Sequence, residues 1–441
     1  MNKNIKLAVA GAIFAAASAA QAGIVIPAGD WTLDVSGNVN AYNIYSRGKG
    51  TASIGGGLAG KGTATGDTTT SGMQNGLLPN FLSIGASTRQ NDLDVAFVIS
   101  LQPGTGATAS LAQVGSDGNA GLNNRQSFMT FGDKSWGSVK VGKDLGVFAS
   151  DAILSDMTLL GVGGTLGGST SSGNTTLGRI GSGYIYAEWK PQITYTTPNM
   201  GGFQATVGIT QAMTAGSLAN VAGTQAANAA TTQDGVTGTA TTGRYLSRTG
   251  STQSNPAYEG KASYSFSAND ITGKVWVSGL AQRSGVNGAN DDLTVYVGDI
   301  GANVNAAGFG LTGYYYAGQG IGTTGQMLDG YSAFNGNARD SDGGYVQGTY
   351  ILPTKTKVGI SWGISNLDLA AGETTAKSTV NTAGAGAGVL VKENEMWTAG
   401  LYHPLTKHLN LVAEYSNLKS KNQANESNTT NVGSLGAILF F

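Results

Sequence analysis

The alternation of apolar and polar residues over segments of about ten residues is the feature that most restricts the fold of this chain. In the stretch DWTLDVSGNVNAYNIYS, Trp31, Leu33 and Val35 fall on one face, and Asp34 falls on the other. A period of two with one apolar face indicates a β-strand that has one side in an apolar environment. Each segment is about as long as a tilted strand that crosses a bilayer. Residues that we expect to face lipid include Leu33, Val95, Phe97, Val207, Leu411 and Leu439.

Sixteen segments have this character, and tight turns such as Arg89–Asp92 and Pro198–Gly201 alternate with longer polar loops along the chain. An even number of strands with loops sorted by length is typical of outer-membrane barrels. A β-solenoid would instead need a fixed period of about 20–50 residues, which the chain lacks. We therefore expect an all-β fold, a 16-stranded antiparallel transmembrane β-barrel with short periplasmic turns and long external loops. The predicted strands are residues 30–48, 80–89, 92–102, 125–133, 136–144, 191–199, 202–212, 257–267, 270–282, 291–304, 306–318, 343–352, 356–366, 392–403, 408–419 and 429–441.

The first 22 residues have the pattern of a secretory signal peptide. Lys3 and Lys6 precede the apolar run LAVAGAIFAAASAA, and Ala20-Gln21-Ala22 matches an A-x-A cleavage site. The apolar run is shorter than the roughly 20 residues that a spanning helix needs. We expect residues 1–22 to be a signal peptide and residues 23–441 to form the barrel domain.

Composition excludes several other classes of protein. The chain has 25 basic and 26 acidic side chains, so it lacks the excess of positive charge that nucleic-acid binding requires. It has no cysteine, which excludes a disulfide scaffold and thiolate chemistry. Charged residues make up only 12%, which is unlike a disordered chain. No later apolar run is long enough for a membrane-spanning helix.

The chain ends on the unusual sequence SLGAILFF. Leu435, Leu439 and Phe441 share one face, so we expect the terminal ring to face lipid at the periplasmic interface, where aromatic side chains form a girdle. Pairing of this last strand with the one that starts near Trp31 would close the sheet and remove both free edges.

Several stretches, in this order around the predicted strands, resemble the Gram-negative trimeric general-diffusion porins along the whole length of the barrel domain. They are NRQSFMTFGDKSWGSVKVGKD at 124–144, LGVFASDAILSDMTLLGVGG at 145–164, LGR at 177–179, PQITYTTPNMGGFQATVGI at 191–209, GLYHPLTKHLNLVAEYSN at 400–417, and the terminal Phe441. The resemblance implies a water-filled pore in the outer membrane, narrowed by a third external loop, here Leu145–Lys190, that folds inward.

The resemblance also implies a constriction with acids on the loop and bases on the wall. By motif position, Arg125 and Arg179 match wall arginines, Lys143 stands in place of an arginine, and Asp156 matches a loop acid. Parity adds Lys190, which alternates with Gln192 and Thr194. The predicted pore constriction is therefore Arg125, Lys143, Asp156, Arg179 and Lys190.

The chain departs from the family pattern at several positions. The segment LLGVGG at 159–164 is apolar where the family commonly has a glutamate, and Ser83 stands where a wall arginine is usual. Around Arg125 the parity is also imperfect, because Phe128 and Phe131 cannot both face lipid. Bases still outnumber the remaining loop acid, which favours a weak preference for anions.

We thus expect a channel, without a cofactor and not an enzyme, for passive diffusion of small hydrophilic solutes and ions. Its partners would be these solutes and outer-membrane lipid, with no nucleic acid. Small residues on the outward faces of the first and last strands suit close packing against another barrel, and with the resemblance they predict a homotrimer. These residues are Gly37, Ala41, Gly433 and Ala437.

An outer-membrane barrel with a non-transport role, an adhesin or an enzyme, is the alternative. The histidines, His403 and His408, flank a predicted periplasmic turn and lie far from any set of residues that would form a triad or a metal site. GVGGTLGG lacks the Gly-Lys-Ser/Thr ending of a phosphate loop. In RDSDGG, Asp340 and Asp342 could bind calcium, but the other ligands are missing, so we favour a polar loop tip.

Overall fold

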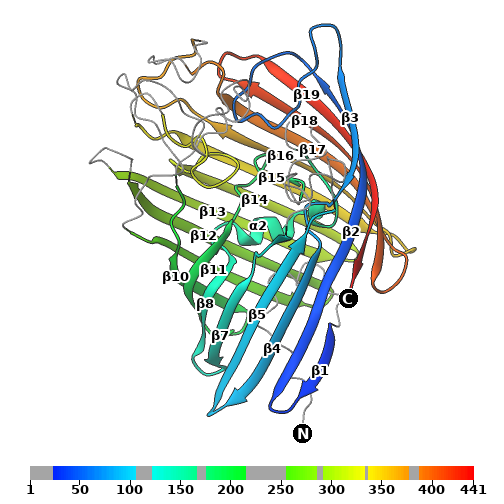
Figure 1. Ribbon diagram of the computed structural model, residues 1–441, viewed down its shortest axis with the longest axis vertical. Coiled ribbons are helices and arrows are strands. Elements are labelled where there is room, and N and C mark those ends of the chain that lie inside the picture. The colour runs from blue at the N-terminus through cyan, green and yellow to red at the C-terminus, as the bar shows by residue number, and fades with distance from the viewer. Residues whose placement is uncertain are drawn as a thin grey trace, which may run out of the picture.

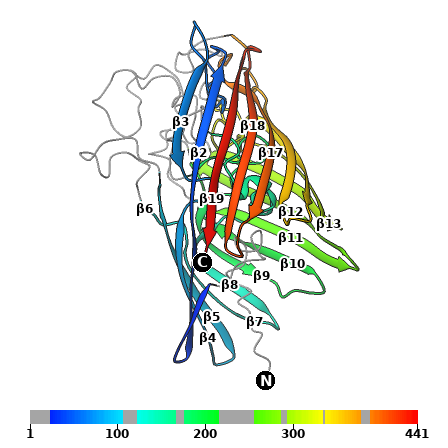
Figure 2. The ribbon, with the colours of Figure 1, turned by 90° about the vertical axis from the view of Figure 1, so that its right-hand side faces the viewer.

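A computed structural model describes residues 23–105, 122–165, 175–214, 255–285, 292–332, 336–376 and 387–441. The predicted signal peptide lies outside these residues. The described chain forms one antiparallel sheet that closes on itself, as Figures 1 and 2 show. Within the described ranges, no helix is both long and apolar enough to cross a bilayer.

Over the described ranges, the sheet contains nineteen strands. They are β1 (Ile24–Ala28), β2 (Trp31–Lys49), β3 (Thr68–Gln74), β4 (Phe81–Gln90), β5 (Leu93–Pro103), β6 (Leu122–Asn123), β7 (Ser127–Asp133), β8 (Gly137–Leu145), β9 (Trp189–Thr196), β10 (Phe203–Thr210), β11 (Ala257–Ala268), β12 (Ile271–Gly285), β13 (Asp292–Ala306), β14 (Phe309–Gln319), β15 (Asp340–Ile351), β16 (Lys357–Leu367), β17 (Val391–Pro404), β18 (Leu409–Asn422) and β19 (Ser427–Phe440). Two short helices, α2 (Ser150–Ser155) and η3 (Met157–Leu160), lie in the third external loop.

The register of these strands gives a barrel of sixteen. β3 and β4 both pair with β2 and are successive parts of one strand, and β6 and β7 have the same relation along β5. β1 adds a separate short strand beside β2. Pairing of β19 with β2, and of β9 with β10, completes the ring. The predicted fold is confirmed, and the predicted strand ends differ from the observed ones by only a few residues, except in the second strand, whose first part, β3, was not predicted.

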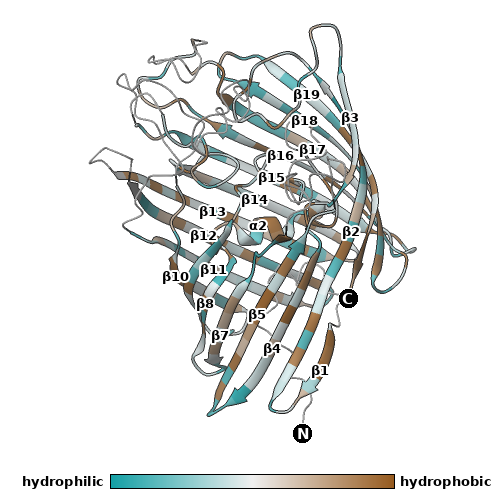
Figure 3. Ribbon diagram, in the orientation of Figure 1, coloured by the Kyte–Doolittle hydropathy of each residue, from teal (hydrophilic) through white to brown (hydrophobic). Residues whose placement is uncertain are grey.

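The two faces of the wall follow the predicted alternation, which Figure 3 shows as bands along β2. In β19, Leu435 is 66% exposed on the outward face, whereas Ile438 is fully buried on the inward face. The residues predicted to face lipid lie on outward rows of the sheet. β2 and β19 carry apolar residues on both faces because loop residues cover their inward side, as in the packing of Tyr42 and Phe440 with Met157.

The terminal residue is held by the first strand. Phe441 and Gly37 exchange two backbone hydrogen bonds, of 2.8 and 3.1 Å, which continue the pairing of β19 with β2. A Cβ at Gly37 would lie 2.9 Å from the ring atom Cζ of Phe441, so the ring covers this glycine. The apolar end of the chain is thus part of the closed sheet.

Two features of the sheet were not predicted. β1 continues the sheet past the chain end, pairing Ile24 with Val35 and Ala28 with Trp31 where β19 has stopped (Figure 1). It covers an edge of β2 that would otherwise be free. The second strand is interrupted at 75–80, where the chain turns inward and Leu77 is buried against the third loop.

The main core lies inside the barrel, between the third loop and the wall. It joins Phe148, Ile153 and Tyr184 of the loop to Trp276 of β12 and Tyr345 of β15. Burial against this loop explains why the inward faces of β12, β14 and β15 carry large aromatic side chains inside a barrel.

Candidate functional site: the lining of the lumen

The third external loop, which connects β8 to β9, crosses the lumen. On one side, the backbone N–H groups of Val147 and Phe148 donate to Oε2 of Glu259 on β11, at 2.7 and 2.8 Å. On the other side, Oε2 of Glu414 on β18 accepts from loop amides in the same way. Since β11 and β18 lie in distant parts of the wall, the loop must span the space between them, where Figure 1 shows α2. The inward-folded loop agrees with the prediction.

Glu414 on β18 places a carboxylate beside the loop segment 159–164, which lacks the glutamate that is common in the family. The N–H groups of Val162 and Gly163 donate to its Oε2 at 2.7 and 2.8 Å, and the Tyr402 hydroxyl donates to its Oε1 at 2.6 Å. A Cβ at Gly161 would lie 2.1 Å from Glu414 Oε1, so a side chain here would displace the carboxylate from its present position. The wall therefore supplies the carboxylate and the glycine-rich loop supplies the donors.

Lys190 lies inward, as its parity predicts, but it is buried in an ion pair. Its Nζ lies 2.5 Å from Glu259 Oε1 and 2.8 Å from Gln326 Oε1, and both charged side chains are 0% exposed. The Thr210 hydroxyl also donates to Glu259 Oε1, at 2.8 Å. The pair thus joins β9, β10 and β11 to the third loop without contact with water in the lumen.

Asp156 lies inside the loop. It caps η3, accepting from the Thr158 N–H at 3.0 Å and the Thr158 hydroxyl at 2.6 Å. The Tyr184 hydroxyl donates to its Oδ2 at 2.9 Å. Burial and then the Asp156 charge raise the pKa of Tyr184 well above its ordinary value, so this hydroxyl stays a donor. Asp156 is buried, and its oxygens hold the loop in shape.

Arg179 is fully buried between the loop and the wall. Its Nη1 donates to the Met396 carbonyl of β17 at 2.9 Å, and its Nη2 donates to the Ser361 hydroxyl of β16. Burial lowers its pKa from the ordinary value. Its contacts attach the loop to the strands of the wall.

Lys143 and Arg125 lie near the external end of β7 and β8. Lys143 pairs with Ser127 on the outward row that also contains Met129 and Val141, and its Nζ donates to the Asn124 carbonyl at 2.8 Å. This register differs from the lumen-facing position carried over by motif. Arg125 lies with its guanidinium carbon 5.9 Å from the centre of the Trp189 ring.

Lys140 lies on the inward row of β8. Its Nζ contacts Asp144 and lies 4.9 Å from the centre of the Phe128 ring. Phe128 is therefore inward and Phe131 outward, which resolves the conflicting parity of these two rings. The side chain of Lys140 is 25% exposed, and so it borders the lumen.

Three further lysines lie on inward rows, and motif matching missed them. Lys261 of β11 and Lys274 of β12 both contact Asp151 of α2. Lys357 of β16 lies with its Nζ 4.8 Å from the centre of the Tyr402 ring, and among the described residues it forms no ion pair. Parity could have identified them, because each lysine lies on the face opposite the exposed apolar residues of its strand.

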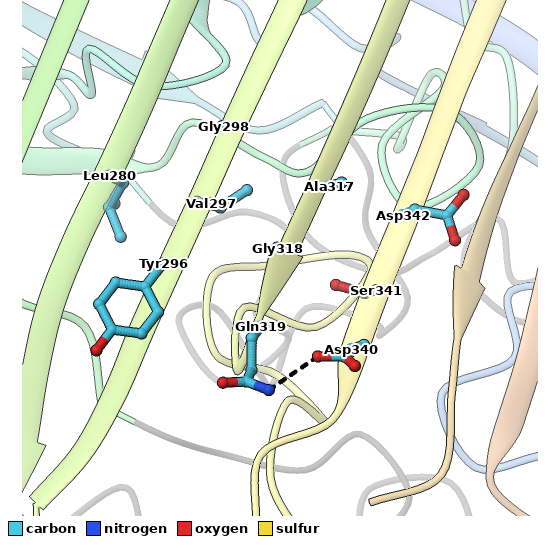
Figure 4. Close-up of a pocket in the computed structure, with 10 residues that line it drawn as sticks. All are labelled: Leu280, Tyr296, Val297, Gly298, Ala317, Gly318, Gln319, Asp340, Ser341 and Asp342. Carbon is cyan, nitrogen blue, oxygen red and sulfur yellow. Dashed lines mark hydrogen bonds between the residues drawn. The ribbon is translucent and has the colours of Figure 1, made fainter.

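A hollow of about 560 Å³ lies on the outside of the wall rather than in the lumen. Figure 4 shows its polar end, where the Gln319 amide donates to Asp340 at 3.0 Å beside Asp342. The residues that line this hollow include exposed ones on the outward rows of the strands, such as Tyr296. Within the described residues, no group of three histidine, aspartate or glutamate side chains could hold a metal ion.

Comparisons with known proteins agree with this architecture. A profile of the Gram-negative porins matches residues 7–423. No curated protein sequence matches the chain. Among solved structures, an anion-selective porin from Comamonas acidovorans is similar with a TM-score of 0.54 and 15% identity, covering 93% of this chain and 100% of that one.

Two other solved structures are similar. The outer membrane channel DcaP of Acinetobacter baumannii gives a TM-score of 0.59 at 16% identity, over 96% of this chain and 100% of that chain. OmpF of Salmonella typhi gives a TM-score of 0.51 at 12% identity, over 95% of this chain and 100% of that chain. The structures show the fold, and the profile covers nearly the whole chain. This protein therefore belongs to the Gram-negative porins, barrels of the outer membrane through which small hydrophilic solutes diffuse passively.

Proposed function

We propose that this porin passes small hydrophilic solutes and ions with a modest preference for anions. The observation that carries the proposal is the difference in exposure on the inward rows: the side chains of Lys261 and Lys274 are 20% and 36% exposed, whereas that of Asp151 is 7% exposed. Lys261 and Lys274 share a single loop carboxylate, Asp151, and Lys357 forms no ion pair among the described residues. Arg125, which lies over the Trp189 ring, contributes a further positive charge.

Inward acids such as Glu259, Asp299 and Glu414 are buried, so the partly exposed lysines act most directly on ions in a narrow pore. Low-dielectric walls focus the field of fixed charges, so counter-ions concentrate near the lysines. The formal charge of the whole chain is −1, which would favour cations if all charges acted equally. Acids at the rim act weakly on the lumen, because salt screens charges over about 8–10 Å.

Reversal potentials in a KCl gradient across a planar bilayer test the proposal. We expect an anion preference that Lys357→Met reduces, and that Arg125→Ala reduces less. Lys143→Met is the matched control, because it removes the same charge from an outward row. A preference for cations in the unmodified protein, or equal effects of Lys357→Met and Lys143→Met, would contradict the proposal.

The roles predicted for the other constriction residues remain part of this proposal, in altered form. Arg179, Asp156 and Lys190 are buried, and so we propose that they set the width of the pore by holding the loop. Arg179→Ala and Asp156→Asn should then change conductance more than selectivity. The family and fold are those of non-enzymatic channels, which is why we favour transport over an adhesin or a barrel enzyme.

The proposed assembly is a homotrimer that packs through the first and last strands. Ala41 pairs with Ala437, so the outward surface of these strands carries small side chains. A Cβ at Gly433 would meet nothing within 4 Å, so packing within this barrel does not require glycine there. Gly433→Trp should therefore dissociate the assembly in mild detergent, as measured by native mass spectrometry. Gly313→Trp on β14 is the control, since a Cβ there also has open space. A monomeric unmodified protein would refute the trimer.

A further inference from the structure

Two lysines on adjacent strands hold one carboxylate from both sides. Lys261 Nζ lies 3.1 Å from Oδ2 of Asp151, and Lys274 Nζ contacts Oδ1 of the same group. Lys261 also donates to the Ser150 hydroxyl, at 3.0 Å. Two cations that each contact a different oxygen form a receptor for a carboxylate, here occupied by a residue of the third loop.

Exposure distinguishes this receptor from the other ion pair beneath the loop. The side chain of Lys261 is 20% exposed and that of Lys274 is 36% exposed, whereas that of Asp151 is 7% exposed. The ammonium groups thus border the lumen, and the loop covers the carboxylate. In the Lys190–Glu259 pair both side chains are fully buried, so a solute has no access.

Neighbouring acids do not neutralise both lysines. Asp299 lies on the next strand, where its Oδ1 accepts from the Ser278 N–H and hydroxyl, both at 2.7 Å. Its Oδ2 accepts from the Tyr314 hydroxyl at 3.0 Å. These wall donors satisfy Asp299, and among the described residues it forms no ion pair with either lysine.

We infer that Lys261 and Lys274 bind the carboxylate groups of anionic solutes in the lumen, and that Asp151 occupies this site when no solute is present. The inference rests on the proposed anion preference and adds a substrate class to it. An incoming carboxylate meets the exposed side of the lysines and replaces one of the two contacts with Asp151. Because Asp151 keeps the other lysine, its buried carboxylate retains a counter-charge, and the partly exposed contact that is lost is individually weak.

The concentration dependence of single-channel conductance in potassium acetate tests the inference, since a binding site makes conductance saturate. We expect Lys261→Met and Lys274→Met to raise the half-saturating acetate concentration about two- to fivefold, the effect of losing one partly exposed ion pair. Asp151→Asn should lower it by about the same factor, because the internal competitor is removed. Lys261→Arg should retain saturation.

Matched controls come from the Lys140–Asp144 pair, in which one lysine contacts one acid at the lumen. Lys140→Met and Asp144→Asn change the net charge as the corresponding lysine and Asp151 variants do, and they should move the half-saturating concentration less. Heat-modifiable migration on gels verifies that each variant is a folded barrel. Equal shifts in the two sets, or equal saturation by chloride and acetate, would overturn the carboxylate site.

Failure of this inference can be separated from failure of the proposed function. If the KCl gradient shows an anion preference that Lys357→Met reduces, while Asp151→Asn leaves acetate saturation unchanged, only the carboxylate site is lost. A channel without any anion preference in KCl would refute the proposed function itself.

Discussion

Two charged regions beneath the third loop use the same chemistry for different purposes. At Lys190 and Glu259 the ion pair is completely buried and the carboxylate also accepts from loop amides. At Lys261, Lys274 and Asp151 the lysines remain partly in water. The difference teaches that exposure to the lumen, rather than the presence of charge, separates residues that hold the loop from residues that can meet a solute.

The largest effect is expected from breaking the buried pair. Lys190→Met leaves Glu259 buried without its counter-charge, which should lower the free energy of unfolding by about 3–5 kcal/mol. Urea unfolding in lipid vesicles measures this, with Lys143→Met as the outward control. Adding Glu259→Gln to the Lys190 variant should recover part of the loss. A loss no larger than that of Lys143→Met would show that the pair is hydrated, and the comparison would then fail.

Replacing a buried acid instead of a buried base sharpens the comparison, because it tests whether the carboxylate holds the loop. Glu414→Ala removes the acceptor for the amides of Val162 and Gly163 and for the Tyr402 hydroxyl. Leaving such buried donors unpaired costs about 1–3 kcal/mol each if they find no other partner. We therefore expect this part of the loop to leave the wall, with lower thermal stability and a changed single-channel conductance. Unaltered conductance together with unaltered stability would mean that Glu414 does not hold the loop.

At Lys261, Lys274 and Asp151, a substitution should change selectivity more than stability, the reverse of the effect at the buried pair. Lys274→Met leaves Asp151 with Lys261 as its partner, and because the lost contact is partly exposed it should cost about 1 kcal/mol or less. Selectivity should change more than in Lys190→Met. Urea unfolding and reversal potentials, measured on the same two variants, test this reversal. Parallel changes in both quantities would remove the distinction between the two regions.

The wall was predictable from sequence because its periodicity is local. A one-residue shift of register moves every side chain to the other face, so alternation fixes the orientation of Leu439 or Gln192 with no knowledge of the rest of the chain. The same rule places Lys143 outward and Lys140 inward. Motif position selected Lys143 because a motif records spacing in the chain and not strand register.

The site was harder to predict because burial in the lumen depends on loop contacts between distant residues. Asp156 and Arg179 occupy the loop that was expected to narrow the pore, but their partners, Tyr184 and the Met396 carbonyl, become neighbours only after the loop folds inward. Alternation also cannot identify β1, since five residues are too few to show a period. Long-range packing therefore decides which charges meet water.

An ion pair between two external loops provides the most subtle test of the comparison. Arg339 donates to both oxygens of Glu373, at 2.9 and 2.5 Å, and each side chain is 4% exposed. The Arg339 Nη1 also donates to the carbonyls of Asp329 and Tyr331, both at 2.7 Å. The pair is buried like Lys190–Glu259, yet it lies outside the membrane-spanning strands, where the bulk pH can reach it.

Acidification should open this contact. Burial by itself raises the pKa of Glu373, but its hydrogen bonds with Arg339 and the Arg339 charge outweigh burial, and the net shift is downward from 4.5. A lowered pKa in the folded state means that the pair stabilises the loops above the unfolded pKa and that this contribution is lost as the pH falls through the folded pKa. The hydrogen-exchange protection factors of residues 368–376, which correct for the pH dependence of the intrinsic exchange rate, should therefore fall below about pH 4.

Glu373→Gln should have low protection factors at every pH, and Asp342→Asn, on the nearby outward row, should retain the pH dependence. Equal protection factors at pH 7 and pH 3 in the unmodified protein would show that burial alone, without the charge of the pair, holds these loops together.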